Sequence, residues 1–204
     1  MRILAVDAGN SRVKWGFTDG GLSERGQWLA LGVAAIDDLE QGIGKAWESL
    51  GVPDRIAVAN VAGSSVESDL AGLLDHWGVA PAWLRATAAA CGVENAYTRP
   101  AQLGVDRWAA LVAARARHAA ASLVVLAGTA TTIDFLDASG VFRGGMILPG
   151  TRLMKQALHE NTAGLPLAQG EYLARPRSTA DAIETGCRLA QVAAIERAYR
   201  ELPQ

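Results

Sequence analysis

The chain opens with Arg2-Ile3-Leu4-Ala5-Val6-Asp7-Ala8-Gly9-Asn10-Ser11, a short apolar run that ends in an acid and a polar turn. Such a run, bounded by Gly and Asn, predicts a buried strand, and Val13–Thr18 predicts a second strand after the turn. About 120 residues later the pattern returns, with a strand at Leu123–Leu126, the turn Ala127-Gly128-Thr129 and a strand at Thr131–Phe135. The sequence therefore predicts two halves that begin alike.

The remainder of the chain predicts strands that alternate with amphipathic helices. In the first half we expect strands within Glu24–Ala30 and at Arg55–Val61 and Ala82–Arg85, and helices at Ile36–Leu50, after a Ser64-Ser65 cap, and at Ala101–Ala120 behind Pro100. In the second half we expect a strand at Val141–Ile147, the segment Thr151–Asn161 and a helix at Ser178–Leu202. This order is that of an α/β layer with a mixed sheet and resembles a ribonuclease-H-like half. We therefore expect two such halves, 1–121 and 122–204.

Composition and charge exclude several classes of protein. Of the 204 residues, 50% are apolar and 20% are charged, which is typical of a globular protein. The 19 basic and 21 acidic residues contain no basic block, so nothing favours a nucleic acid or a membrane surface as partner. No run approaches the roughly 18 apolar residues of a membrane span. Cys91 and Cys187 lack metal-ligand spacing, and we expect two small buried residues of a cytoplasmic protein.

The two turns are candidates for phosphate binding. The Asp7–Ser11 turn can direct backbone N–H groups and its amide and hydroxyl side chains toward a phosphate, with Lys14 as a nearby cation. Asp7 itself would repel phosphate, so its expected task is to hold magnesium, directly or through water. Gly128-Thr129-Ala130-Thr131-Thr132 repeats the arrangement with hydroxyls. Either turn alone is most often an ordinary polar hairpin, but two at matching points favour the phosphates of a nucleotide.

A third motif, Gly104-Val105-Asp106-Arg107, falls at the start of a predicted helix. Asp106 lies off the apolar stripe of that helix, so it faces a cleft or solvent. A carboxylate beside an arginine on a first helical turn is most often a solvated charge. In a kinase the same carboxylate could accept the proton of a substrate hydroxyl, and Arg107 could hold an anionic end of the substrate. The residues alone leave both interpretations open.

Five motifs occur in the order seen in type III pantothenate kinases, which the chain resembles over essentially its whole length. They are Asp7-Ala8-Gly9-Asn10-Ser11, Tyr97 followed by Pro100, Leu103-Gly104-Val105-Asp106-Arg107-Trp108, Gly128-Thr129-Ala130-Thr131-Thr132 and Gly144-Gly145-Met146-Ile147-Leu148-Pro149-Gly150. The branch that includes the Bvg accessory factor is most similar, because it shares Gly9-Asn10-Ser11-Arg12 and Asn60-Val61-Ala62-Gly63. The resemblance implies the actin-like ATPase fold of the acetate and sugar kinase, Hsp70 and actin superfamily. It also implies ATP-dependent phosphorylation of the 4′-hydroxyl of pantothenate, the first step toward coenzyme A.

The resemblance also implies roles by position. The residues matching ATP-phosphate contacts are Asp7, Ala8, Gly9, Asn10, Ser11, Arg12, Val13, Lys14, Gly128 and Thr129. Those matching the pantothenate pocket are Tyr97, Gly104, Val105, Asp106, Arg107 and Thr179. Asp106 matches the proton acceptor. Family members are homodimers whose substrate pocket borders the subunit interface.

The chain departs from the family at two points. Leu126 stands where the family commonly has an aspartate that holds a monovalent cation, which leaves potassium or ammonium binding there open. The second half is about 40 residues shorter than a complete repeat, and nothing after Gly186 matches the Gly-rich adenosine-binding motif of the family. We therefore expect a shortened second half. The alternative to a kinase is a non-catalytic regulatory protein that binds pantothenate or a phosphate.

Overall fold

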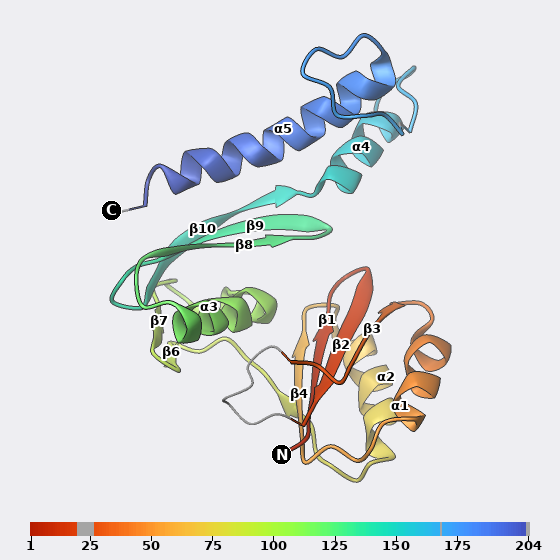
Figure 1. Cartoon of the computed structure of the whole chain (residues 1–204), viewed down its shortest axis with the longest axis vertical. Coiled ribbons are helices and arrows are strands. Elements are labelled where there is room, and N and C mark those ends of the chain that lie inside the picture. The colour runs from red at the N-terminus through yellow and green to blue at the C-terminus, as the bar shows by residue number, and fades with distance from the viewer. Residues whose placement is uncertain (20–26, 168, 203–204) are drawn as a thin grey trace. The chain divides into compact units, whose positions relative to one another are not determined.

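Two five-stranded mixed sheets organise the structure, a computed structural model that describes residues 1–19, 27–167 and 169–202 (Figure 1). The first sheet belongs to a unit made of Met1–Ala86 and Ala101–Ala109, which we call unit 1. The second belongs to unit 2, made of Thr87–Pro100 and Ala110–Gln204. The expected halves, 1–121 and 122–204, concern a duplication rather than packing, and they stay a prediction.

The sheet of unit 1 has the order β3-β2-β1-β4-β5. Its strands are β1 (Ile3–Ala8), β2 (Arg12–Thr18), β3 (Ala30–Ala35), β4 (Arg55–Asn60) and β5 (Ala82–Trp83). The helices of the unit are a π-helical turn (Glu40–Gly44), α1 (Lys45–Glu48) and α2 (Ser64–Asp75). Because β1 is antiparallel to β2 and parallel to β4, the β1–β2 turn lies at the sheet edge where β4 also ends.

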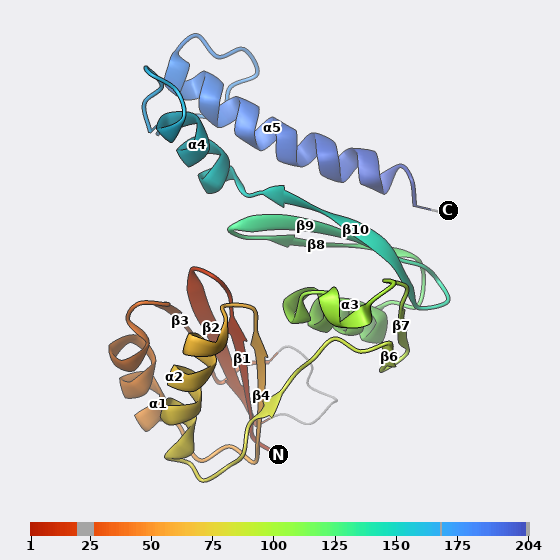
Figure 2. The same cartoon turned by 180° about the vertical axis from the view of Figure 1, so that it is seen from behind.

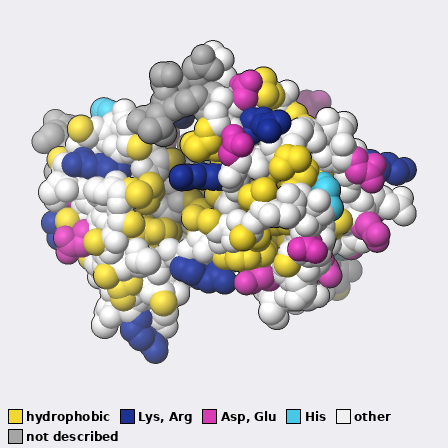
Figure 3. All heavy atoms as spheres, turned by 90° about the horizontal axis from the view of Figure 1, so that it is seen from below, with side chains coloured by type: hydrophobic (Ala, Val, Ile, Leu, Met, Phe, Trp, Pro, Cys, Tyr) yellow, Lys and Arg dark blue, Asp and Glu magenta, His cyan; other side chains and the backbone are white. Residues whose placement is uncertain are grey.

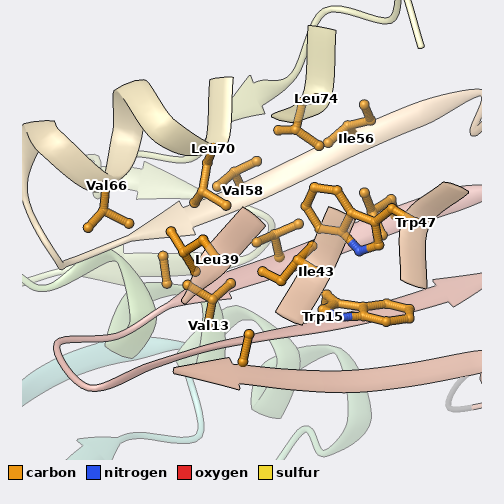
Figure 4. Close-up of a cluster of buried hydrophobic side chains, with 14 of the residues drawn as sticks. Val13, Trp15, Leu39, Ile43, Trp47, Ile56, Val58, Val66, Leu70 and Leu74 are labelled. Carbon is orange, nitrogen blue, oxygen red and sulfur yellow. The ribbon is translucent and has the colours of Figure 1, made fainter. Parts of the chain in front are cut away.

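The core of unit 1 lies between this sheet and the helices α1 and α2, which cover one of its faces (Figure 2). Figure 4 shows the buried side chains of both helices meeting those of β2 and β4, with Trp47 edge-on to Trp15 at 6.3 Å between ring centroids. Along β1, Leu4, Val6 and Ala8 are buried in this core. Because successive strand residues point to opposite faces, Asp7 lies on the face away from α1 and α2.

The sheet of unit 2 has the order β6-β7-β10-β9-β8. Its strands are β6 (Ala89–Ala90), β7 (Val93–Asn95), β8 (Ser122–Ala127), β9 (Ala130–Leu136) and β10 (Val141–Pro149). Two helices follow the last strand, α4 (Thr151–Glu160) and α5 (Thr179–Tyr199), and they pack against each other. A further helix, α3 (Val105–Arg117), follows a 3₁₀ turn at Pro100–Gln102, so the expected helix at Ala101–Ala120 starts later and ends earlier.

The structure corrects several expected elements of the first half. The third strand is Ala30–Ala35 rather than a strand within Glu24–Ala30, of which residues 24–26 lie outside the described residues. The expected helix at Ile36–Leu50 shortens to the π-helical turn and α1. The residue that caps α2 is Gly63, whose φ of 99° favours glycine, and no side chain caps the helix.

A small hairpin, β6–β7, was not expected from the sequence. Its two turn residues, Cys91 and Gly92, have φ values of 51° and 76°, the positive pair that a two-residue type I′ turn requires. Asn-Gly is the usual sequence for such a turn, so the Cys91-Gly92 pair did not indicate a hairpin. Cys91 is therefore exposed rather than buried, whereas Cys187 is buried as expected.

The described residues contain no membrane-spanning helix, and charges of both signs are mixed on the face shown in Figure 3. Among the described residues, no helix combines the length and apolar composition that crossing a bilayer requires. On the face displayed in Figure 3, acidic and basic side chains are interspersed.

Candidate active site

The β1–β2 hairpin presents Asp7 and Lys14 side by side. The N–H of Gly9 donates to the carbonyl of Arg12 at 3.0 Å and closes the turn. Asp7 and Lys14 are register partners across the two strands, so their side chains share one face. Lys14 Nζ lies 3.8 Å from Asp7 Oδ2, with the side chains 63% and 48% exposed respectively. The hairpin thus offers one carboxylate and one ammonium group to solvent.

Asp106 lies on the first turn of α3, directly over Gly104. The N–H of Trp108 donates to the carbonyl of Gly104 at 2.9 Å and starts the helix. A Cβ atom added to Gly104 would lie 2.5 Å from Asp106 Oδ1. Gly104 therefore leaves empty the space that the carboxylate occupies, a role that its place in the motif did not reveal.

Electrostatics connect the two motifs within unit 1. Partial burial raises the pKa of Asp7, Lys14 opposes this rise, and the negative charge of Asp106 adds to it. The carboxylates of Asp7 and Asp106, far apart in sequence, are therefore close enough to influence each other. Sequence patterns could place each on its own element but not the two together.

The carboxylate of Asp7 is an oxygen donor of the kind that magnesium prefers. Magnesium takes oxygen ligands and usually keeps several waters while it binds one or two carboxylates and the phosphates of a substrate. The described residues contain no cluster of three or more His, Cys, Asp or Glu side chains that could hold a metal. At Asp7, a magnesium ion would take its other ligands from water and from phosphate oxygens.

Several expected site residues are buried. Ala8, Val13 and Val105 belong to the core, so only their backbone groups can reach a ligand. Arg107 was expected to offer its charge to a substrate anion, but its side chain is only 4% exposed and is not free of partners. Asn10 and Arg12, by contrast, are exposed in the hairpin turn.

In unit 2 the Gly128–Thr129 turn packs directly on the residue before α4. The N–H of Gly128 donates to the carbonyl of Ala130 at 3.0 Å, and the N–H of Gly150 donates to the carbonyl of Thr129 at 2.8 Å. A Cβ atom on Gly150 would collide with the carbonyl oxygen of Gly128 and lie 2.7 Å from that of Thr129. The last glycine of the Gly144–Gly150 motif therefore supports the turn, since no other residue leaves room for it.

Tyr97 is positioned by a residue that sequence reasoning missed. The buried Asn95 accepts the Tyr97 N–H at 3.1 Å and donates to the carbonyls of Thr87 and Pro100 at 3.3 and 3.2 Å. The Tyr97 ring packs against Phe142 with centroids 5.1 Å apart. An asparagine at the end of a strand, two residues before Tyr97, was the available signal.

The last expected residues of unit 2 are Thr179 and Leu126. Thr179 is the exposed first residue of α5, whose cap is Ser178, the acceptor of the Asp181 N–H. It lines an apolar groove of about 860 Å³ between α4 and α5. Leu126 lies in β8 opposite Thr132, and its aliphatic side chain offers no oxygen to a monovalent cation.

The expected residues thus fall into two groups. Unit 1 carries Asp7–Lys14 and Gly104–Arg107, and unit 2 carries Tyr97, Leu126, Gly128, Thr129 and Thr179. Asp134, fully buried on β9 and already partnered, is a charged residue that the motifs did not single out.

Solved structures define the fold class. Superposition on a Campylobacter jejuni protein described as a Baf family transcriptional activator gives a TM-score of 0.57 at 24% identity, over 96% of this chain and 78% of that one. A Sinorhizobium meliloti protein described as a 2-dehydro-3-deoxygalactonokinase gives 0.55 at 16% identity, over 97% and 81%. Together with the two mixed sheets, these likenesses make the chain a protein of the actin-like ATPase fold.

Sequence comparison then identifies the family within this fold. The family model for type III pantothenate kinase matches residues 3–201. A type III pantothenate kinase of Aromatoleum aromaticum is 51% identical over 98% of this chain and 80% of the relative, and one of an Azoarcus species is 48% identical over 98% and 74%. The chain belongs to the type III pantothenate kinase family, and the resemblance in the motifs is confirmed.

Proposed function

We propose that this chain transfers the γ-phosphoryl group of ATP to the 4′-hydroxyl of pantothenate, with Asp106 as the base. The observation that carries this proposal is that the charge of Asp106 acts on Asp7, whose Oδ2 lies 3.8 Å from Lys14 Nζ in the same unit. Phosphoryl transfer depends mainly on positioning and charge neutralisation, and a base at the attacking hydroxyl adds to both. Asp106 would supply the base, and Asp7 on the hairpin would take part in charge neutralisation.

The proposed reaction moves one proton and one phosphoryl group. The carboxylate of Asp106 takes the proton of the 4′-hydroxyl while the hydroxyl oxygen bonds to the γ-phosphorus. The bond from that phosphorus to the β,γ-bridging oxygen breaks, and ADP leaves with the electron pair. Lys14 and the N–H groups of the hairpin turn neutralise phosphate charge. Asp7 would hold magnesium, which supplies further charge neutralisation when bound.

Residues of unit 2 take roles by their place in the family motifs. Thr129 would contact ATP phosphate, and Gly128, whose own N–H closes the turn, would let the phosphate approach the backbone closely. The support of the turn by Gly150 favours both roles. Tyr97 and Thr179 would contact pantothenate, since the first is held by Asn95 and the second is exposed at the start of α5. The buried Arg107 would act on pantothenate through its charge and by positioning other groups, not as a side chain exposed to solvent.

The experiment is the kinetics of Asp106→Asn with Asp69→Asn as control. The amide keeps the shape of the carboxylate but accepts no proton, so kcat should fall by about 10²- to 10⁴-fold with the circular dichroism spectrum unchanged. Asp69 is an exposed carboxylate of α2, and its variant should keep the wild-type rate. Undiminished turnover in folded Asp106→Asn would refute the base. Pantothenate binding without turnover in the wild type would favour the regulatory alternative.

The proposal extends to a homodimer formed through the α4–α5 groove. Leu153 and Leu158 line this groove and remain exposed, and an open apolar patch of this kind marks an association surface. Leu158→Asp places a charge there and should shift the protein to monomer in sedimentation velocity. Val52→Asp, at an exposed apolar residue of unit 1, is the matched control and should leave the mass unchanged. A monomeric wild type, or a Leu158→Asp dimer, would contradict this interface.

A further inference from the structure

Gln191 on α5 makes an unusual set of contacts for a buried side chain. It is 9% exposed, its Nε2 donates to the carbonyl of Pro149 at 2.8 Å, and Nε2 lies 3.7 Å from the Met154 sulfur. A carbonyl oxygen and a thioether sulfur both accept hydrogen bonds and neither donates. The chemistry of the partners therefore orients the amide, with its nitrogen toward β10 and α4.

The Pro149 carbonyl belongs to the same peptide group as the Gly150 N–H, which bonds to the Gly128–Thr129 turn. Pro149 ends β10 and pairs with Ala130 of β9. The next residue, Gly150, donates its N–H to Thr129 and has no space for a side chain against the turn. A shift of the Pro149–Gly150 peptide would therefore move the turn. Gln191 is the side chain of α5 that holds this peptide from the other side.

The other half of the amide has no partner. Among the described residues, Gln191 Oε1 is one of the few buried side-chain atoms that lack a hydrogen bond. An unpaired buried acceptor opposes folding. A methionine of similar length would remove that acceptor, but it would also take from the Pro149 carbonyl the donor that glutamine supplies. What the glutamine contributes here is the hydrogen bond from Nε2 to Pro149.

We propose that Gln191 is a positioning residue for ATP: through Pro149 and Gly150 it fixes the Gly128–Thr129 turn in its phosphate-binding form. This rests on the proposed function, which assigns that turn to ATP phosphate. Gln191 does not touch the substrate. Its effect is indirect: it acts on the N–H groups and hydroxyl of the turn through Pro149 and Gly150. The binding of pantothenate does not depend on Gln191.

The test compares Gln191→Met and Gln191→Glu with Thr185→Val. Methionine keeps the length of the side chain without the donor, and an ionised glutamate keeps the shape but turns an acceptor toward the Pro149 carbonyl. Thr185, also buried on α5, bonds to the N–H and carbonyl of Leu173, so its valine variant removes bonds of the same kind that do not lead to the turn. We expect both Gln191 variants to raise KM for ATP about five- to tenfold, the effect of one hydrogen bond.

Two readouts separate positioning from general destabilisation. KM for pantothenate should stay within about twofold of wild type in both Gln191 variants, and Thr185→Val should change neither KM. Hydrogen exchange of the Gly150 amide, measured by NMR, should accelerate in Gln191→Met and stay unchanged in Thr185→Val. An unchanged KM for ATP, or an unchanged Gly150 exchange rate, would overturn the inference.

The exchange measurement needs no turnover, so it distinguishes two failures. If the wild type does not phosphorylate pantothenate, the proposed function fails. Gly150 exchange then still decides whether Gln191 fixes the turn. If the wild type is active and Gly150 exchange is the same in all variants, the failure belongs to the Gln191 inference alone.

Discussion

Gly104 leaves the space that the carboxylate of Asp106, the proposed base, occupies. A methyl group there would lie 2.5 Å from Asp106 Oδ1, closer than real contacts allow, so the carboxylate of Gly104→Ala must turn away. A small displacement of a catalytic group costs rate far more than it costs binding. We expect kcat to fall by about 10- to 100-fold in this variant, with KM for ATP nearly unchanged.

The control for this prediction is Gly72→Ala. Gly72 lies in α2 with open space around the added methyl, and alanine favours helix more than glycine does. Steady-state kinetics should show a wild-type rate for this variant, and thermal unfolding a slightly higher midpoint. A wild-type kcat in Gly104→Ala would mean that the carboxylate does not need the space over the glycine.

At the same scale, sequence patterns singled out candidate residues that stand with their own side chains in a motif. Asp7, Lys14 and Asp106 stood out because a strand–turn–strand pattern and a helix start placed them. Asn95 and Gln191 did not, because they bond to backbone carbonyls and N–H groups, which leave no trace in the sequence of the partner. The burial of Arg107 also depends on tertiary packing.

Among the elements, the β9–β10 hairpin depends on an ionised aspartate. Asp137 accepts hydrogen bonds from the Ser139 hydroxyl at 2.6 Å, from the N–H groups of Ser139 and Val141 at 2.9 Å, and from Arg143 Nε at 2.7 Å. These bonds favour the charged form, the Ser139 hydroxyl most strongly, and hold the pKa of Asp137 well below its usual range. The hairpin is therefore stabilised by the carboxylate, not by its acid form.

The pH dependence of stability follows from this lowered pKa. Since the folded pKa lies below the unfolded value of about 3.9, the contribution is complete above that pH and is lost as pH falls through the folded pKa. Asp137→Asn should lower the free energy of unfolding by about 1 kcal/mol near neutral pH, and the difference from wild type should shrink below about pH 4. Urea unfolding at several pH values measures both. Asp69→Asn is the control, and a pH-independent difference would contradict the account.

The third strand shows why some elements escape prediction. Register pairing sets Trp15 of β2 opposite Gly32 of β3, and a Cβ on Gly32 would run into the Trp15 ring. A Cβ on Gly16 would likewise meet the ring of Trp28. Two glycines thus make room for two tryptophans, and β3 forms although Ala, Gly and an exposed edge give it no clear alternation. Strands β1, β2 and β4 were predictable because their buried apolar residues follow a strand pattern, and β8 and β9 because apolar and β-branched residues flank a Gly-Thr turn.

For the whole molecule, the order of elements and the family were predictable because the strand–turn–strand openings and the five motifs can be recognised from sequence alone. The packing was not. Neither unit is a continuous stretch of chain: residues 87–100 belong to unit 2, whereas residues 101–109 return to unit 1. No local sequence pattern indicates this division. What the structure adds is that Asp7 and Asp106 belong to one unit and that the charge of Asp106 raises the pKa of Asp7, which links the β1–β2 hairpin to the proposed base.

The measurement that tests the account most directly is detection of the product. The purified chain is incubated with pantothenate, ATP and magnesium, and the mixture is followed by mass spectrometry and by phosphorus NMR. We expect ATP-dependent formation of 4′-phosphopantothenate and an equal amount of ADP, both formed about 10²- to 10⁴-fold more slowly by Asp106→Asn. Pantothenate that binds in calorimetry but stays unphosphorylated with ATP at millimolar concentration would contradict it.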